Sequence, residues 1–303
     1  MNNSKGVLVM AYGTPAGPQE IEAYYTDIRG GRTPAPELLD ELTARYAAIG
    51  GRSPLLEIST AQARGIEERL GVRTYLGQKH AAPFIADAVA ALVADGIAYA
   101  AGLVLAPHFS TMSVGDYEAR ARRAAAESGW GGSLAMVSSW HLEPGYVRWL
   151  AQRVEEALSC LPTAAQNKAT VVFSAHSLPQ SIRERGDPYP QQLEATAARV
   201  AAAAGLERWT TGWQSAGRTA QPWLGPDVTE VIEDLASAGA EGVVVCPCGF
   251  VADHLEVLYD LDIEAKKRAE EIGLAFARTR SPNADPEFLD VLATVAARAL
   301  RST

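Results

Sequence analysis

The feature that most constrains the fold of this chain is a nine-residue pattern that occurs twice. Residues 7–15 read Val-Leu-Val-Met-Ala-Tyr-Gly-Thr-Pro, and residues 171–179 read Val-Val-Phe-Ser-Ala-His-Ser-Leu-Pro. In each, an apolar run ends in Ala, one side chain able to bind metal follows, and a Pro stands three residues later. An apolar run stopped by Pro is typical of a buried strand that opens into a loop. Because ligands bind at the carboxyl ends of parallel strands, Tyr12 and His176 are candidate site residues.

The repeat extends over the whole chain. Strands that alternate with helices indicate a parallel sheet covered on both faces. The alternative is that two doubly wound domains share Val-rich strands by composition, but the shared Ala-x-x-x-Pro spacing favours a true duplication. The matching apolar segments are 73–77 and 210–214, 102–108 and 242–248, and 134–138 and 274–278. The helix-like stretches between them are 83–94, 117–127, 146–158, 191–204, 228–238 and 253–272.

We therefore predict an α/β fold of two similar halves, each a four-stranded parallel sheet flanked by helices, with the active-site cleft between them. The first domain is expected to cover residues 1–145, and the second domain residues 146–303. A C-terminal helix at 286–301 is expected to pack back on the first domain.

The first half carries an insertion after its first strand. The segment 12–72 is 28 residues longer than the matching segment 176–208. The extra residues predict helices at 20–28, 37–48 and 61–70, the last capped by Ser59 or Thr60. An insertion at the ligand-binding end of a sheet is typical of a lid or a substrate wall, which we place at residues 16–72.

Arginine is frequent in this predicted wall although the protein is acidic. Arginines near a cleft suit a substrate that carries carboxylates. Arginines at helix ends are also stabilised by the helix dipole, which explains Arg29 and Arg45 equally well, so both interpretations stay open. The candidate residues of the wall are Arg29, Arg32, Arg45, Tyr46, Arg52 and Ser53.

Charge and hydropathy exclude several classes of protein. The net charge of −9 makes nucleic acid a poor partner. No apolar run approaches the about 20 residues that a membrane span needs. The N-terminus has neither the basic start nor the cleavage site of a signal peptide, which disfavours a periplasmic solute receptor. We therefore expect a cytoplasmic protein without a transmembrane segment.

The three cysteines fit a reducing compartment. Cys246 and Cys248 are spaced like metal or redox ligands, but on a strand they share one face, and Cys246 matches Ala106 in the repeat. Small buried residues are the simpler interpretation. Only Cys160 remains as a third thiol, so a four-cysteine cluster is not expected.

A row of carboxylates follows the strand that ends near Pro247. On a helix, Glu256, Asp260 and Glu264 lie at i, i+4 and i+8 and would line one face. Like charges at this spacing destabilise a helix, so the row predicts a compensating cation. A merely solvated acidic face is the alternative. A neutral imidazole such as that of His176 beside a carboxylate would suit Fe²⁺, Zn²⁺ or Co²⁺ and could accept protons near neutral pH. His80 and His108, also at loop ends, are weaker candidates.

Several longer motifs resemble the ferrochelatase family, and within it the bacterial coproporphyrin type. The resemblance runs from end to end and implies two similar Rossmann-like domains of the chelatase kind. The motifs that carry it are Met-Ala-Tyr-Gly-Thr-Pro (10–15), Ala-Pro-His-Phe-Ser (106–110), Ser-Ala-His-Ser-Leu-Pro (174–179), Gly-Asp-Pro-Tyr-Pro (186–190), Gly-Trp-Gln-Ser (212–215), Trp-Leu-Gly-Pro-Asp (223–227) and Gly-Phe-Val-Ala-Asp-His-Leu-Glu (249–256).

The resemblance also implies roles for single residues. His176 and Glu256 would handle the metal and the pyrrole protons on one side of the porphyrin, and Tyr12 would be the metal ligand on the other. Asp260 and Glu264 would continue a carboxylate track to the surface. The residues implied to hold the macrocycle and its propionates are Tyr12, Arg29, Arg45, Tyr46, Ser53 and Tyr117.

The chain departs from some relatives in its cysteines. Some ferrochelatases hold an iron–sulfur cluster through cysteines in a C-terminal extension, whereas this sequence has no cysteine after Cys248. We therefore expect no iron–sulfur cluster and no permanently bound cofactor.

These observations predict a lyase of haem biosynthesis that inserts Fe²⁺, as a substrate, into coproporphyrin III. A ferrochelatase acting on protoporphyrin IX is one alternative, and a non-catalytic haem or metal carrier that uses the same cleft is another. We expect a monomer that makes transient contacts with neighbouring haem-pathway enzymes.

Overall fold

The computed structural model of the chain describes residues 4–301 and contains two four-stranded sheets, with strand orders β2-β1-β3-β4 and β6-β5-β7-β8. All neighbouring strands are parallel, and the two orders correspond position by position. The predicted fold class is confirmed. The strands are β1 (Lys5–Ala11), β2 (Arg73–Gln78), β3 (Tyr99–Val104), β4 (Ser133–Met136), β5 (Ala169–His176), β6 (Trp209–Gln214), β7 (Gly242–Cys246) and β8 (Ala275–Arg278).

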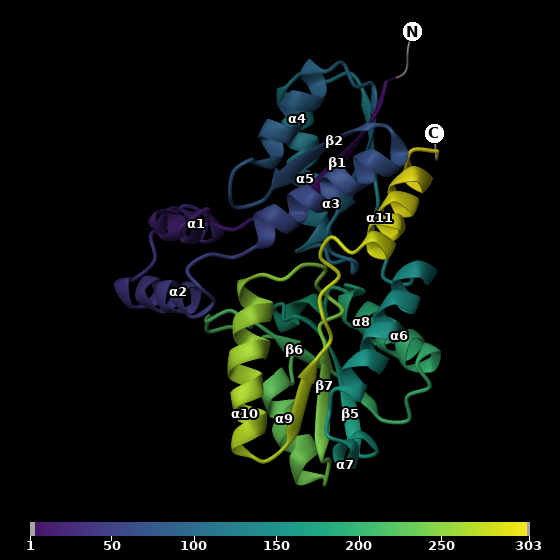
Figure 1. Cartoon of the computed structure of the whole chain (residues 1–303). Coiled ribbons are helices and arrows are strands. Elements are labelled where there is room, and N and C mark those ends of the chain that lie inside the picture. The colour runs from purple at the N-terminus through teal and green to yellow at the C-terminus, as the bar shows by residue number, and fades with distance from the viewer. Residues whose placement is uncertain (1–3, 302–303) are drawn as a thin grey trace.

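Helices cover both faces of the first sheet, which lies in the upper half of Figure 1. One face of β1, with Leu8 and Met10, packs against α4 (Ile85–Ala94) and α5 (Val114–Glu127). The other face, with Val7 and Val9, packs against α3 (Leu55–Leu70) and α11 (Pro286–Ala299). Because both faces are covered, β1 is apolar along its length rather than alternating.

The second sheet is covered in the same way. Its first face packs against α6 (Pro144–Ser159) and α8 (Tyr189–Ala203), and its second against α9 (Val228–Ser237), the π-helix η3 (Val257–Ala265) and α10 (Lys266–Glu271). The main hydrophobic core runs from the first sheet to the second through α11 and α6. The remaining short elements are η1 (Pro18–Glu20), α7 (Thr163–Gln166) and η2 (Gln180–Ile182).

The C-terminal helix α11 lies against α3 and β3 of the first sheet and against α6 (Figure 1). The Tyr99 hydroxyl donates to the carbonyl of Ala299 at 2.7 Å, and Arg69 Nε lies 2.5 Å from Asp290 Oδ1. The helix α6 starts at Pro144 and packs on α8 and β7, close to the expected domain boundary at 145/146. The exact division of the chain stays a prediction.

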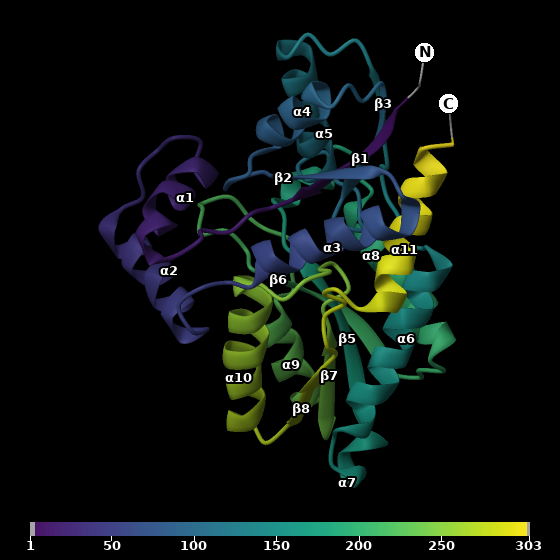
Figure 2. The ribbon, with the colours of Figure 1, turned by 45° about the horizontal axis from the view of Figure 1, so that its top comes forward.

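The insertion forms α1 (Ile21–Ile28) and α2 (Pro36–Ala48), which stand away from the first sheet in Figures 1 and 2, and then α3. The prediction that α3 begins near Ala61 with Ser59 or Thr60 as its cap is wrong. The helix begins at Leu55, whose amide donates to the Ser53 hydroxyl, and Ser59 is buried inside it. Pro54 stands just before the first turn and leaves no amide unsatisfied there. Figure 2 shows α3 lying between the two sheets.

The helix-like stretch expected at 253–272 is helical from Leu255 to Glu271, but its middle part is not an α-helix. Asp253 and His254 lie in a loop, and residues 257–265 form a π-helix before α10 begins. A π-helix bonds each residue to the one five positions away, so its turn is wider than that of an α-helix. Apolar periodicity over so few residues does not separate the two helix types. No helix among residues 4–301 is both long enough and apolar enough to span a bilayer.

Candidate active site

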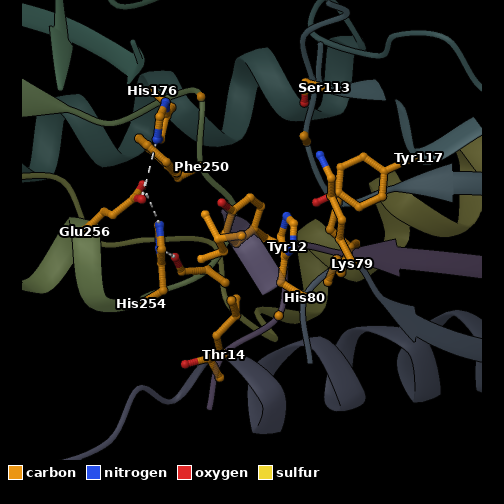
Figure 3. A pocket seen from close by; sticks show the side chains of 18 of the residues that line it. Tyr12, Thr14, Lys79, His80, Ser113, Tyr117, His176, Phe250, His254 and Glu256 are labelled. Atoms are coloured by element: carbon orange, nitrogen blue, oxygen red, sulfur yellow. Dashed lines mark hydrogen bonds and ion pairs between the residues drawn. The ribbon is translucent and has the colours of Figure 1, made fainter. Parts of the chain in front are cut away.

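A cavity of about 550 Å³ lies at the carboxyl ends of β1, β2 and β5, between the two sheets. This volume is typical of a site for a small molecule. Figure 3 shows His176, Glu256 and His254 on one wall and Tyr12, His80, Lys79 and Tyr117 on the other. The repeated strand ends, Tyr12 and His176, therefore contribute to opposite walls of one cavity.

Glu256 lies between two imidazole rings. Its Oε1 is 3.5 Å from His176 Nε2, and its Oε2 is 3.6 Å from His254 Nε2. The Nδ1 atom of His176 contacts the carbonyl of Ser177, and Nδ1 of His254 lies 2.9 Å from the carbonyl of Ala252. A carbonyl oxygen only accepts hydrogen bonds, so each Nδ1 carries a hydrogen and each Nε2 is directed at the carboxylate.

The His176–Glu256 pair is ionised at neutral pH. Burial alone would lower the pKa of His176, but the negative charge of Glu256 outweighs it and raises that pKa to about 9. Burial alone would raise the pKa of Glu256, but His176 and His254 hold it well below its ordinary value. The resting site therefore contains an imidazolium beside a carboxylate.

Tyr12 projects into the cavity from the end of β1 with 40% of its surface exposed. Its ring centroid is 4.7 Å from that of His80, whose Nδ1 lies 2.6 Å from Asp27 Oδ2 on α1. Desolvation in the cleft, and then the charge of Glu256, raise the pKa of the Tyr12 hydroxyl. The phenol is therefore neutral and faces the cavity opposite His176.

Three of the expected substrate contacts line the cavity as well, namely Tyr46, Ser53 and Tyr117. Tyr46 Oη lies 3.2 Å from Thr14 Oγ1, and burial raises the pKa of this tyrosine to about 12. Tyr117 is buried on α5. These residues supply neutral aromatic surface and hydroxyl groups, which suit a flat macrocycle.

Arg29 and Arg45, which sequence places in the substrate wall, do not line the cavity. The guanidinium carbon of Arg29 lies 5.8 Å from the ring centroid of Tyr25 on α1. Arg45 points to the second domain, where its guanidinium stacks 4.6 Å from the ring centroid of Tyr259. In this structure Arg45 binds carboxylates of the second domain, whereas the buried Nε of Arg29 has no hydrogen-bond partner.

The carboxylate row leads away from the cavity along η3, with Glu256 at the cavity end. Arg45 Nη1 lies 3.3 Å from Asp260 Oδ1, and Arg45 Nη2 lies 3.7 Å from Glu264 Oε2. The Ser215 hydroxyl donates to Asp260 Oδ2 at 2.5 Å. In this structure the cation beside Asp260 and Glu264 is the guanidinium of Arg45, and the assignment of these carboxylates to a metal track stays a prediction.

Burial, followed by the charge of Glu256, raises the pKa of Asp260 to about 7. Within residues 4–301, no group of three or more His, Cys, Asp or Glu side chains is arranged to hold a metal ion. His176 and Glu256 supply one imidazole nitrogen and one carboxylate. This donor set suits the transient binding of a borderline divalent metal ion.

Sequence reasoning missed four residues at this site: His254, Lys79, Asp116 and Arg120. For His254 the available signal was its place in the same motif as Glu256. For Lys79 it was the position directly after the end of β2, since ligands bind at the carboxyl ends of parallel strands. His108 also lines the cavity. Its Nε2 lies 2.9 Å from Thr196 Oγ1, and burial lowers its pKa to about 3, so its imidazole is neutral.

The cysteines lie away from the cavity lining. Cys246 and Cys248 are buried, and burial raises the pKa of the Cys246 thiol to about 12. Cys160 is exposed at the end of α6. The buried thiols are protonated and take the place of small apolar residues.

The chain is similar to known proteins over nearly its whole length. The profile of the family described as Ferrochelatase matches residues 4–300. A "Coproporphyrin III ferrochelatase" of Anoxybacillus flavithermus is 49% identical, with 98% of this chain and 96% of the relative covered. The protein of the same name from Bacillus subtilis is 48% identical, with 97% of each chain covered.

Solved structures with a similar fold are chelatases. The sirohydrochlorin chelatase SirB from Bacillus subtilis subspecies spizizenii, in complex with cobalt, has a TM-score of 0.58 at 11% identity and covers 98% of this chain and 95% of its own. SirB from Bacillus subtilis with Fe³⁺ has the same TM-score at 12% identity, with 99% and 98% covered. At such identity the likeness concerns the fold alone. The match of the family profile and the high identity to curated relatives confirm the resemblance seen in the motifs: this chain belongs to the ferrochelatase family.

Proposed function

We propose that this protein is a metal chelatase of the lyase class that inserts Fe²⁺ into coproporphyrin III, giving iron coproporphyrin and two protons in haem biosynthesis. The observation that carries the proposal is the His176–Glu256 pair, which faces Tyr12 across the cavity between the two sheets. Family membership and two relatives named "Coproporphyrin III ferrochelatase" support the choice of reaction and porphyrin. The iron keeps its oxidation state, so no electron is transferred.

Proton transfer is assigned to His176. At rest His176 holds a proton because Glu256 stabilises the imidazolium. When Fe²⁺ binds to Glu256, the positive charge of the metal opposes that of the imidazolium and lowers the pKa of His176, which then loses its proton. The neutral Nε2 can accept the first pyrrole proton as the metal enters the ring, release it to solvent, to which 34% of the His176 side chain is exposed, and then accept the second. Glu256 thus couples the arrival of the metal to the appearance of a base.

Tyr12 is assigned to the other face of the porphyrin. Its raised pKa keeps the phenol neutral in the resting site, so it adds no negative charge to compete with Glu256 for the incoming cation. After insertion, the phenol oxygen would bind the metal from the side opposite His176, and the position of Tyr12 on the opposite wall of the cavity supports this assignment. The ring of His80 packs against that of Tyr12, with 4.7 Å between their centroids.

Iron is proposed to reach Glu256 by way of Glu264 and Asp260. Each carboxylate oxygen can replace a water ligand of the ion. Arg45 holds both outer carboxylates in the resting structure, so the ion must compete with this guanidinium. The assignments of Arg29, Arg45 and Ser53 to the propionates remain proposals and, for the two arginines, require their side chains to move.

The remaining expectations are kept as proposals: a cytoplasmic monomer without a permanently bound cofactor or iron–sulfur cluster, in transient contact with other enzymes of the pathway. Its acidic net charge of −9 supports the absence of nucleic acid among its partners.

The test is an anaerobic assay of the protein with Fe²⁺ and either coproporphyrin III or protoporphyrin IX, followed by the Soret band. Many turnovers on coproporphyrin III, lost in His176→Ala, are expected. Faster turnover on protoporphyrin IX would contradict the choice of porphyrin. A spectral change that stops at one equivalent and survives the substitution would identify a carrier instead.

A further inference from the structure

A second charged cluster, formed by Lys79, Asp116 and Arg120, lines the cavity. Figure 3 shows its Lys79 on the wall opposite His176. Lys79 Nζ lies 2.6 Å from Asp116 Oδ2, and Arg120 Nε lies 3.1 Å from the same oxygen. Lys79 follows β2, and Asp116 and Arg120 are one turn apart on α5. The proposed proton transfer uses none of them.

Lys79 and Arg120 are the two Lys or Arg side chains that line the cavity among residues 4–301. Arg29 and Arg45 lie outside the lining. If a ligand in this cavity carries a carboxylate, Lys79 and Arg120 are therefore the cationic side chains with which it can pair.

The cluster carries excess positive charge. Burial would raise the pKa of Asp116, but Lys79 and Arg120 outweigh it and lower that pKa, so Asp116 is ionised. One carboxylate thus faces two cations. The Lys79 side chain is only 11% exposed, and a cation this poorly solvated is stabilised by a further anion. The charge balance favours an anionic group of the ligand here.

The surroundings of Lys79 leave room for a second acceptor. An ammonium group donates up to three hydrogen bonds, so Lys79 can keep Asp116 and bind another carboxylate. Its Nζ lies 5.2 Å from the ring centroid of Tyr117, and Figure 3 shows Ser113 on the same wall. Ser113 lines the cavity and supplies a hydroxyl donor on this wall.

A purely structural role is the competing explanation. Arg120 Nη1 donates to the carbonyl of Lys79 at 3.3 Å, so the cluster also ties the loop after β2 to α5. A tie of this kind affects folding stability and the binding of every porphyrin alike. A ligand contact affects only porphyrins that carry the matching carboxylate.

We propose that Lys79, which shares the carboxylate of Asp116 with Arg120, binds a propionate carboxylate that coproporphyrin III carries where protoporphyrin IX has a vinyl group. This inference rests on the proposed function and adds to it a residue that determines specificity. A vinyl group has no charge and cannot replace the propionate at a desolvated ammonium, so the contact selects the porphyrin by charge.

The test is equilibrium binding of the metal-free porphyrins, measured by quenching of their fluorescence, which requires no metal insertion. In Lys79→Met the Kd for coproporphyrin III is expected to rise about tenfold, and the Kd for protoporphyrin IX to stay within roughly twofold. Arg122→Met is the matched control, because Arg122 lies on the same helix and pairs with Glu118 at the protein surface. It is expected to change neither constant.

Asp116→Asn supplies a second variant with an effect of opposite sign. Removal of the competing carboxylate frees Lys79, so the Kd for coproporphyrin III is expected to fall. Equal weakening for both porphyrins in either variant, or no change in Lys79→Met, would overturn the inference. Turnover by the wild-type protein is measured separately: its absence would contradict the proposed function, whereas turnover combined with an unaltered Lys79→Met affinity would contradict this inference alone.

Discussion

Arg45 on α2 and Asp260 on η3, 215 positions apart in the sequence, form an ion pair with 3.3 Å between Nη1 and Oδ1. The pair joins the helical insertion of the first domain to the carboxylate row of the second. Arg45 also reaches Glu264, so one guanidinium spans both outer carboxylates. On the proposed path of the metal to Glu256, this guanidinium lies beside the carboxylates that would bind the ion.

Replacement of this guanidinium should therefore strengthen metal binding. In Arg45→Met, Asp260 and Glu264 lose the cation that competes with the metal, and the affinity for Zn²⁺ in the absence of porphyrin is expected to rise roughly fivefold, which corresponds to about 1 kcal/mol. Isothermal titration calorimetry measures this affinity. Arg52→Met, which removes an exposed pair with Glu57 on the same insertion, is the control. A fall in affinity in Arg45→Met would mean that Arg45 organises the row for metal instead.

The Glu256 charge should determine the protonation of His176. The pKa of His176 is raised from 6.5 to about 9 because the charge of Glu256 outweighs burial. In Glu256→Gln burial remains and the charge is lost, so the pKa is expected to fall below 6.5. An NMR titration of the imidazole C–H signals measures this change. An unaltered pKa in the variant would show that another group holds the proton.

Asp260 should make the protein less stable as pH rises. Its pKa is raised from 3.8 in the unfolded chain to about 7 in the folded protein, so the folded state retains a proton that the unfolded state has lost. The resulting loss of stability starts above the unfolded pKa and is complete above the folded pKa. Asp260→Asn mimics the protonated group at every pH. The Tm of the variant minus the Tm of wild type is therefore expected to be larger at about pH 8 than at about pH 5, by roughly 2 °C or more.

Thermal unfolding at both pH values measures this difference. Asp262→Asn serves as the comparison on the same helix, since Asp262 is more exposed and pairs with Arg278. A difference in Tm between Asp260→Asn and wild type that does not grow with pH would contradict the raised pKa of Asp260.

Gln62 should contribute to the junction between the domains. This buried side chain on α3 donates from Nε2 to the carbonyls of Val251 at 2.9 Å and Asn283 at 2.8 Å. Gln62→Leu leaves both carbonyls without this donor and is expected to lower the free energy of unfolding by about 2 kcal/mol. Urea denaturation measures the loss. Gln166→Leu, which removes a partly buried bond on the short helix α7, is the milder comparison, and an equal effect would argue against the importance of Gln62.

The sequence predicted much of the fold because the relevant signals are local. Apolar runs bounded by Pro or Gly mark the strands, and the repeat relates β1 to β5 and β3 to β7 before any contact is known. The rule that ligands bind at the carboxyl ends of parallel strands then selected Tyr12 and His176. Both line the cavity, on opposite walls.

The sequence by itself thus determined the two parallel sheets, their duplication and the strand ends that bear the site, since each follows from residues close together in the chain. Only the tertiary structure decided that Arg45 pairs with Asp260 and Glu264, that His254 is the second imidazole at Glu256, and that Lys79 joins Asp116 and Arg120. The physical reason is that a long side chain takes whichever opposite charge the packing brings near it. That choice depends on the orientation of α2, α5 and η3 against the sheets, which no local pattern of residues records.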